Sequence, residues 1–580
     1  MNKMDRIAVA ALVAALIAWS FLGRQFMPEP APVAEPESVP VEDRGVVAPV
    51  PAPAPAVAAP GVAVAEPPEP AEAPVVVALP DPVIVTLTNS VFALDFTSHG
   101  GGIASIALFE YAAAVDARED PVVLAFDSLP ALRLAGLPGF SATPLFVLEP
   151  LAGGNGIRMT AESEWVRLVR TVLLSDGYAI TVQDELENLT DAPLVLAGQT
   201  LHAGQMELQE AGPGMRGMSY LGVDFLPADG RRVEHTGKRL RGYFGVGGGC
   251  GTPDLRHVPL TAEARYEEPI VWAAVKNKFF VQILEPDTGI DVVVVEAQRR
   301  TDDAFVVDGV GAALALPDRE LAAGERVQTE IQYYAGPKKY SLLREAGNRR
   351  ADVMEFGRFF KWICQLLLPL LNAIEHVIPG GYGVAVILLT VIVKLVFWPV
   401  THKGTESMKR MQALQPELKK LREKYKSDPK KLQEKQMLLY RENKVNPLAG
   451  CIPMVIQIPV FIGLFTVLRS AVELRYARFL WIADLSEPEG LLAGVLPLLS
   501  GGLNILPLFM TATMVLQQRL TPSAGDPQQQ KMMAFMPIMM LFIFYNMPSG
   551  LVLYWTVSQG LSILQLFLQR RREAFKPSAG

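Results

Sequence analysis

The chain has 580 residues, of which 50% are hydrophobic and 19% are charged, and its formal net charge at pH 7 is −7. This length exceeds what one hydrophobic core organises, and a mean hydropathy of +0.24 is too high for a wholly soluble protein. Part of the chain is therefore expected in a bilayer, and the acidic balance argues against nucleic acid as the main partner. The cysteines, Cys250, Cys364 and Cys451, are too widely spaced for a disulfide scaffold or a CxxC zinc site.

The N-terminal segment is apolar over residues 7–22 and follows Lys3 and Arg6. Its length lies between the core of a signal peptide and a full membrane span, and we interpret residues 1–26 as a retained signal anchor, with a cleaved signal peptide as the alternative. Residues 27–80 contain 15 prolines among 54 positions. Such a composition cannot bury enough apolar surface to form a core and predicts a disordered linker.

The next region, residues 81–340, consists of short β-rich runs separated by turn residues. Its clearest signal is a hairpin, in which runs at 169–174 and 178–182 flank the turn residues Asp176 and Gly177. Asp-Gly pairs tolerate the positive φ angles of a tight hairpin turn. We therefore expect a large, all-β sandwich.

The C-terminal region, residues 381–570, carries apolar segments close to the ~20 residues that a ~30 Å hydrocarbon layer requires. These five segments are residues 381–400, 448–468, 503–518, 532–547 and 551–568. Before them, residues 341–380 include a mixed apolar and charged stretch with Lys361 and Glu375, which predicts an amphipathic helix along the membrane interface.

Charge predicts the orientation of these spans. Between His402 and Asn446 the chain has thirteen basic and six acidic residues, so the segment 402–447 should be cytoplasmic. The loop after the next span is net acidic, and the tail 571–580 begins with two arginines. Including the first segment, we expect six transmembrane helices with both termini in the cytoplasm and the β domain on the opposite side of the membrane.

The segment 402–447 itself reads as a helical hairpin. Apolar residues recur at spacings of three and four, and Pro416 should kink the first helix. Asp428 and Pro429 supply an N-cap and a first-turn proline for the second helix. The hairpin is either a docking surface for cytoplasmic partners or a solvated element that only fixes topology.

The most informative intramembrane residue is Lys394, since a lysine deep in a span costs ~2.5–3.5 kcal/mol on insertion scales. It either snorkels to the interface or faces a wet pocket. Thr390, one turn earlier on the same face, and Gln457 on the next span favour the pocket. None of the five apolar segments contains an acidic residue that could pair with Lys394.

Methionines crowd the span at 532–547, and Met454 and Phe461 lie on another span. Flexible thioethers form adaptable surfaces for varied apolar partners, although core packing is the alternative use.

Catalytic motifs are missing from the sequence. His99-Gly100-Gly101-Gly102 has no accompanying GxSxG nucleophile, and the chain contains no HExxH motif and no P-loop. We therefore expect no enzyme activity, metal, cofactor or nucleotide.

Three stretches carry a family resemblance: NPLAGCIP at residues 446–453, IQIPVF at 456–461 and PSGLVLYW at 548–555. Together they resemble the YidC/Oxa/Alb family of membrane-protein insertases, in its Gram-negative form with a large periplasmic domain. The resemblance extends from the end of the β domain to the last span, and more loosely over the β domain. It implies a periplasmic β super-sandwich, an interfacial helix and a five-helix core that encloses a hydrophilic groove in the inner membrane.

The resemblance also assigns roles. Lys394 stands where the family usually has a groove arginine, which keeps the charge but loses the planar guanidinium fork. The implied groove residues are Lys394, Thr390, Gln457 and Trp555, and the implied hydrophobic slide for substrates comprises Met454, Phe461, Met536, Met540 and Ile543.

The implied function is to insert and fold integral membrane proteins, alone or with the Sec translocon. Implied partners are nascent membrane proteins, the Sec translocon, the lipid bilayer and, weakly through the hairpin and short tail, the ribosome. Two alternatives stay open: a small-solute transporter, which should show paired repeats, and an envelope glycan-binding protein acting through its β domain.

Overall fold

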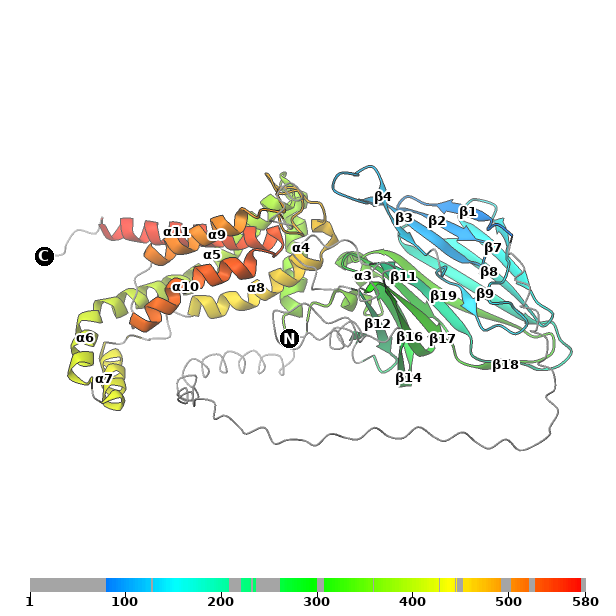
Figure 1. Cartoon of the computed structure of the whole chain (residues 1–580), viewed down its shortest axis with the longest axis horizontal. Coiled ribbons are helices and arrows are strands. Elements are labelled where there is room, and N and C mark those ends of the chain that lie inside the picture. Colours follow the sequence, from blue (N-terminus) through cyan, green and yellow to red (C-terminus); the bar gives the residue numbers. More distant parts are fainter. Residues whose placement is uncertain are drawn as a thin grey trace, which may run out of the picture. The chain divides into compact units, whose positions relative to one another are not determined.

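The computed structural model describes residues 80–126, 129–207, 221–230, 233–235, 261–299, 307–357, 359–426, 428–443, 445, 452–491, 502–520 and 527–574. The predicted signal anchor and nearly all of the predicted linker therefore lie outside the described residues. By its contacts the chain divides into two units, Met1–Asp81 and Pro82–Gly580. The second unit holds the β strands and helices that are labelled in Figure 1.

The β-rich region is built from antiparallel strands. In chain order they are β1 (Ile84–Thr88), β2 (Phe92–Thr97), β3 (Gly102–Ala112), β4 (Pro121–Ala125), β5 (Leu134–Ala135), β6 (Val147–Pro150), β7 (Gly156–Glu162), β8 (Val166–Leu174), β9 (Ala179–Asn188), β10 (Leu194–Leu196), β11 (Thr200–Glu207), β12 (Gly222–Pro227), β13 (Glu234–His235), β14 (Thr261–Lys276), β15 (Phe280–Pro286), β16 (Ile290–Arg299), β17 (Val307–Ala315), β18 (Arg319–Leu321) and β19 (Arg326–Pro337). Strands β1 to β4 form one sheet, and the path β5-β11-β17-β16-β14-β15-β19-β9-β8-β7-β6 forms the large one.

The hairpin expected around Asp176 and Gly177 is confirmed. Strands β8 and β9 pair in antiparallel register from Val166 opposite Asn188 to Leu174 opposite Ile180. Gly177 has φ +104°, a conformation that glycine adopts without steric penalty. The turn residues therefore join two paired strands where the sequence predicted a hairpin.

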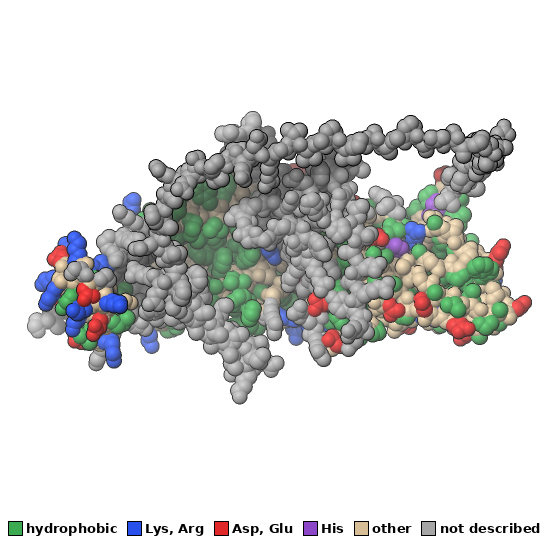
Figure 2. Space-filling view, turned by 60° about the horizontal axis from the view of Figure 1, so that its bottom comes forward, with side chains coloured by type: hydrophobic (Ala, Val, Ile, Leu, Met, Phe, Trp, Pro, Cys, Tyr) green, Lys and Arg blue, Asp and Glu red, His purple; other side chains and the backbone are tan. Residues whose placement is uncertain are grey.

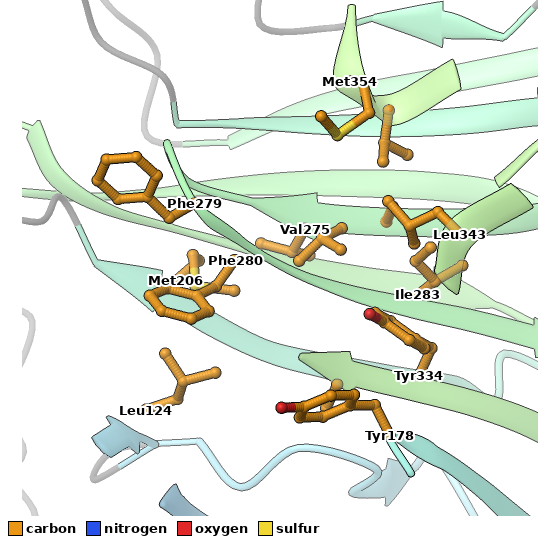
Figure 3. Close-up of a cluster of buried hydrophobic side chains, with 14 of the residues drawn as sticks. Leu124, Tyr178, Met206, Val275, Phe279, Phe280, Ile283, Tyr334, Leu343 and Met354 are labelled. Carbon is orange, nitrogen blue, oxygen red and sulfur yellow. The ribbon is translucent and has the colours of Figure 1, made fainter. Parts of the chain in front are cut away.

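The core of the β-rich region takes side chains from these two sheets, from the small sheet formed by β10 and β18, and from two short helices. These helices are α3 (Tyr340–Glu345) and η2 (Arg350–Met354). Figure 3 shows Val275 and Ile283 of neighbouring strands close to Leu343 of α3 and Met354 of η2. Along β8 and β9 buried residues alternate with more exposed ones, which is the period expected of a half-buried strand.

The helical region follows. Its helices are α4 (Lys361–Val377), α5 (Gly381–Ala413), α6 (Gln415–Lys424), α7 (Pro429–Glu442), α8 (Ile452–Ser470), the short η4 (Val472–Leu474), α9 (Leu506–Leu520), α10 (Pro527–Phe544) and α11 (Ser549–Ala574). Helix α11 lies against α9 and α5, α10 lies against α9, and α8 lies against α4. In Figure 2, Lys and Arg side chains gather with acidic ones at one end of this region, where α6 and α7 lie.

One detail of the hairpin differs from the prediction. Pro416 does not kink a helix, because α5 ends at Ala413 and Pro416 lies in the first turn of α6. A first-turn proline loses no helical hydrogen bond, since its missing N–H has no partner there in any case. The predicted cap of α7 is confirmed, with the Asp428 carboxylate accepting a hydrogen bond from the amide of Lys431 at 3.1 Å.

Two described helices are long and apolar enough to cross a membrane by length and composition, at Gly381–Ala413 and Ser549–Gln569. Shorter apolar helical stretches occur at Ile456–Ser470 and Ala534–Phe544. Helix α5 contains the predicted span 381–400 but continues without interruption into the charged segment after it. Among the described residues, helix length and composition thus support two candidate spans, fewer than the six that the sequence predicts.

Candidate functional site

A polar seam joins α5 to α11. The ammonium of Lys394 donates a hydrogen bond to Oγ of Ser562 at 2.9 Å, and that hydroxyl donates to the carbonyl of Ser558 at 2.9 Å. Lys394 is half-buried. Among the described residues no carboxylate forms an ion pair with Lys394, so its positive charge meets a neutral partner.

Thr390 lies one turn before Lys394 but does not join this seam. Its side chain is fully buried, and its hydroxyl donates to the carbonyl of Val386 in the same helix at 2.6 Å. This bond satisfies the hydroxyl within α5. Thr390 therefore lies in the buried interior between the packed helices, next to Lys394.

A second polar contact joins α8 to α11. The side-chain amide of Gln457 donates to the hydroxyl of Tyr554, which is buried. Within the part of the chain that the structure describes, no hydrogen bond connects Gln457 to Lys394. The predicted groove residues thus form two separate contacts that share α11, rather than one cluster.

Trp555 follows Tyr554 and lies in an aromatic cluster. Its ring meets that of Phe461 edge-on at a centroid distance of 5.2 Å and that of Phe544 at 5.3 Å. Phe461 and Phe544 are 5.8 Å apart, so the cluster connects α8, α10 and α11. The indole N–H of Trp555 is buried and has no hydrogen-bond partner among the described residues. Such an orphaned donor is uncommon in a protein interior.

The predicted hydrophobic slide divides into two faces. Met536 and Met540 are partly buried and pack on the core, as the core-packing alternative would have it. Ile543 is 45% exposed, beside the more exposed Phe535 at 61% and Phe542 at 77%. Met454 lies in α8, but its side chain is outside the described residues.

The sequence interpretation missed several of these residues. Ser558 and Ser562 lie one turn apart on α11, with Gln565 following at the spacing of the same face. Phe535, Ile538 and Phe542 recur at three and four residues on α10 and form an exposed apolar stripe. The spacing of Ser558, Ser562 and Gln565 is visible in the sequence and could have identified that face, whereas on the apolar α10 only the structure shows which face is exposed.

A metal site is not indicated in the described part of the chain, where no three His, Cys, Asp or Glu side chains group in a way that could hold an ion. What the arrangement offers is a lysine charge at a helix seam, hydroxyl and amide groups, and an aromatic surface. Charged, hydroxyl and amide groups can hydrogen-bond polar chain segments, and aromatic rings can pack against apolar ones.

Comparison with known proteins covers both regions. Residues 84–370 match the family described as YidC periplasmic domain, and residues 373–576 match the family described as 60Kd inner membrane protein. A membrane protein insertase YidC from Nitratidesulfovibrio vulgaris strain Miyazaki F is 33% identical, with 98% of this chain and 99% of the relative covered. One from Pelobacter propionicus is 32% identical, with 97% and 98% covered. A solved structure of an active YidC insertase with its first transmembrane domain resolved is similar with a TM-score of 0.33 and 18% identity, covering 84% of this chain and 92% of that one.

Proposed function

The chain belongs to the YidC family of membrane protein insertases, and from this premise we propose that α5, α8 and α11 line the groove that receives a substrate. Its function is to insert membrane proteins into the bilayer. The observation that carries the groove assignment is the seam at Lys394, where a cation lies between two helices with a neutral hydroxyl as its partner. A positive charge in this setting favours the binding of an acidic or polar segment of the substrate.

The proposed path has a polar and an apolar side. The polar segment of a nascent protein enters beside Lys394 and Gln457, which shortens its passage through hydrocarbon. Its apolar helix leaves along the exposed stripe of Phe535, Ile538 and Phe542 and the Phe461 surface. Hydrophobic partitioning of the substrate supplies the free energy, with help from the membrane potential for acidic segments.

The proposed topology has six spans with both termini in the cytoplasm. The apolar helices α5, α8, α9, α10 and α11 together with the N-terminal segment supply them, and the net positive segment that contains α6 and α7 is placed in the cytoplasm. The β-rich domain is placed in the periplasm and the protein in the inner membrane of a bacterium. Helix α4 is placed at the interface, because Trp362, Leu366 and Val377 leave apolar surface exposed on one face of it.

The proposed partners beyond nascent membrane proteins and lipid are the Sec translocon and the ribosome. The basic surface of α6 and α7 supports contact with a negatively charged cytoplasmic partner such as the ribosome. The comparisons favour neither of the two alternatives, a small-solute transporter and an envelope glycan-binding protein. The activity is accordingly insertion without bond-making chemistry.

Site-specific photo-crosslinking tests the groove. A photoreactive amino acid at position 394 of the full-length chain should crosslink to a nascent membrane protein stalled during insertion. The matched control is position 395, because Leu395 is 61% exposed on a different face of the same helix. Equal crosslinking from both positions would contradict the groove, since it would show general contact with the helix rather than a directed site.

A further inference from the structure

The segment between α8 and α9 contains a tight turn. The amide of Phe479 donates to the carbonyl of Ile482 and the amide of Ile482 donates back to the carbonyl of Phe479, both at 2.9 Å. Leu480 and Trp481 form the tip, and they are 76% and 44% exposed, whereas Ile482 is buried. Two large apolar side chains are thus presented outward on a two-residue turn.

The backbone of this turn is strained. Leu480 has φ +51°, in the left-handed region where a side chain with a Cβ meets the following carbonyl oxygen. Glycine, asparagine or aspartate normally occupies such a position in a tight turn. A leucine here is unfavourable for the fold and, in water, unfavourable for solvation as well. This combination points to a role for the side chain outside the fold.

The turn lies at the end of two apolar helices. The ring of Phe479 packs so closely on Gly383 of α5 that a Cβ at that glycine would collide with it. Gly383 is in the first turn of α5, one of the two described helices that are long and apolar enough to cross a membrane. On the other side, the ring of Trp481 lies 6.5 Å from that of Phe509, which is 54% exposed near the start of α9.

The base of the turn is held in place. The amide of Leu485 donates to the carbonyl of Ala477 at 3.1 Å, and the amide of Gly550 at the start of α11 donates to the carbonyl of Leu485 at 2.9 Å. The amide of Ser549 donates to the carbonyl of Glu487 at 2.8 Å. The tip is therefore presented in a fixed position beside the ends of α5, α9 and α11.

We propose that Leu480 and Trp481 form an interfacial anchor that inserts into the bilayer leaflet at this end of the helices. Tryptophan prefers the boundary between hydrocarbon and headgroups, and the exposed Arg478 beside the tip suits a lipid phosphate. Lipid is the occupant because the tip continues the exposed apolar surface of α9 through Phe509. The anchor fixes the depth at which α5 begins in the membrane, and it is independent of the groove.

Depth-dependent fluorescence quenching tests this anchor. The full-length protein is reconstituted in vesicles of phosphatidylethanolamine and phosphatidylglycerol, doped with phosphatidylcholine brominated either near the headgroup or near the chain end. The emission lost in Trp481→Phe isolates the contribution of Trp481. We expect bromine near the headgroup to quench most of it and bromine near the chain end to quench less.

Two other tryptophans are the controls. Trp165 of the β domain is 47% exposed, a close match to Trp481, and its contribution, isolated by Trp165→Phe, should not be quenched by either lipid. Trp398 on α5 should be quenched, which verifies that the helices are in the bilayer. Quenched Trp398 together with a Trp481 contribution as unresponsive as that of Trp165 would overturn the anchor.

A second variant separates anchoring from folding. Leu480→Asn removes the apolar side chain, and asparagine tolerates the left-handed backbone, so the melting temperature in detergent should not fall. In vesicles the quenching of Trp481 should decrease. Unchanged quenching in Leu480→Asn would overturn the role of Leu480 in the anchor. Protection of Trp481 from aqueous quenchers without any response to brominated lipid would assign the tip to a protein partner or a second copy instead.

Discussion

Lys394 and Ser562, 168 positions apart in the chain, meet at 2.9 Å and connect α5 and α11, the two described helices that are long and apolar enough to cross a membrane. The hydroxyl of Ser562 also donates to the carbonyl of Ser558, so its lone pairs are available to the ammonium. A serine stabilises a buried charge less than a carboxylate does. The seam therefore keeps Lys394 in place without neutralising it.

Replacing Lys394 should separate substrates by charge. Lys394→Ala should reduce the insertion of proteins with acidic translocated segments about tenfold, the order of one lost charge-assisted hydrogen bond, and Lys394→Arg should retain it. Insertion into inverted membrane vesicles, assayed by protease protection, measures both. A substrate without acidic residues in its translocated segment is the control. Equal loss for both substrates would favour a structural role.

Replacing Ser562 tests the same seam from the other helix. Ser562→Ala removes the neutral partner but leaves the charge, so Lys394 should become more available and insertion of acidic substrates should be retained. Ser562→Asp should neutralise the lysine and reduce insertion of those substrates by an amount similar to Lys394→Ala. The same protease-protection assay reports it. Full activity of Ser562→Asp would argue against a requirement for free positive charge.

Deleting the hairpin should uncouple capture from membrane integration. Removal of Gln415 to Glu442, the bounds of α6 and α7, leaves α5 and α8 intact. We expect the protein to integrate normally, because span hydrophobicity does not depend on the hairpin, and to lose substrate insertion. Carbonate extraction checks integration, and complementation of a depletion strain checks function. Full complementation would leave the hairpin a topological element only.

The core of the β domain depends on a buried ion pair. Arg170 and Asp184 face each other across β8 and β9, and the guanidinium donates to both carboxylate oxygens at 2.7 and 2.6 Å. Asp184→Asn leaves a buried charge without its partner and should lower the free energy of unfolding by about 3–5 kcal/mol. Glu162→Gln, which removes an exposed partner of Arg167, is the control with little expected change. Urea unfolding followed through the buried Trp272 measures both.

Stability of the β domain should rise above neutral pH because of Lys338. Burial, reinforced by the neighbouring Lys276, lowers the pKa of Lys338 to about 7, against 10.5 for an ordinary lysine. Its ammonium donates to the carbonyl of Asn277 at 2.9 Å. Lys276 differs, because Asp224 and Glu355 overcome its burial and raise its pKa.

The direction of this pH dependence follows from the number of protons that the folded and unfolded states bind. Between pH about 7 and about 10.5 the unfolded chain binds the Lys338 proton and the folded domain does not, so stability increases with pH across this window. The contribution approaches about 1.4 kcal/mol per pH unit within it. Urea midpoints at several pH values measure the slope, which should flatten in Lys338→Met. An identical slope in that variant would assign the pH dependence to other groups.

The sequence alone predicted those features that depend on local chemistry. The turn at Asp176 and Gly177 fixed a hairpin because few residue pairs tolerate its backbone angles. The cap at Asp428 was predictable for a similarly local reason, because the first amides of a helix have no partner within the helix and a carboxylate can accept from them. Separately, the stretches around Pro453 and Trp555 carried the resemblance to the insertase family.

Sequence patterns predicted the structure less well where one pattern is compatible with two structural roles. Pro416 lies among helical residues, and whether it kinks a helix or starts one depends on where the preceding helix ends. Met536 and Met540 face the core while Ile543 is exposed, although all three lie on one apolar helix. On a helix that is hydrophobic all round, sequence does not separate the core face from the lipid face.

The partners of the polar residues were decided only by the tertiary structure. Helical periodicity gives the face on which Lys394 lies, but its partner is Ser562 because α5 packs against α11, and Gln457 contacts Tyr554 because α8 packs against α11. The strained turn at Leu480 was equally invisible, since its φ angle is imposed by contacts with α5 and α11. Local preferences of a few tenths to about 1 kcal/mol per residue select helices and turns, whereas the choice among distant contacts is made by the packing of whole helices.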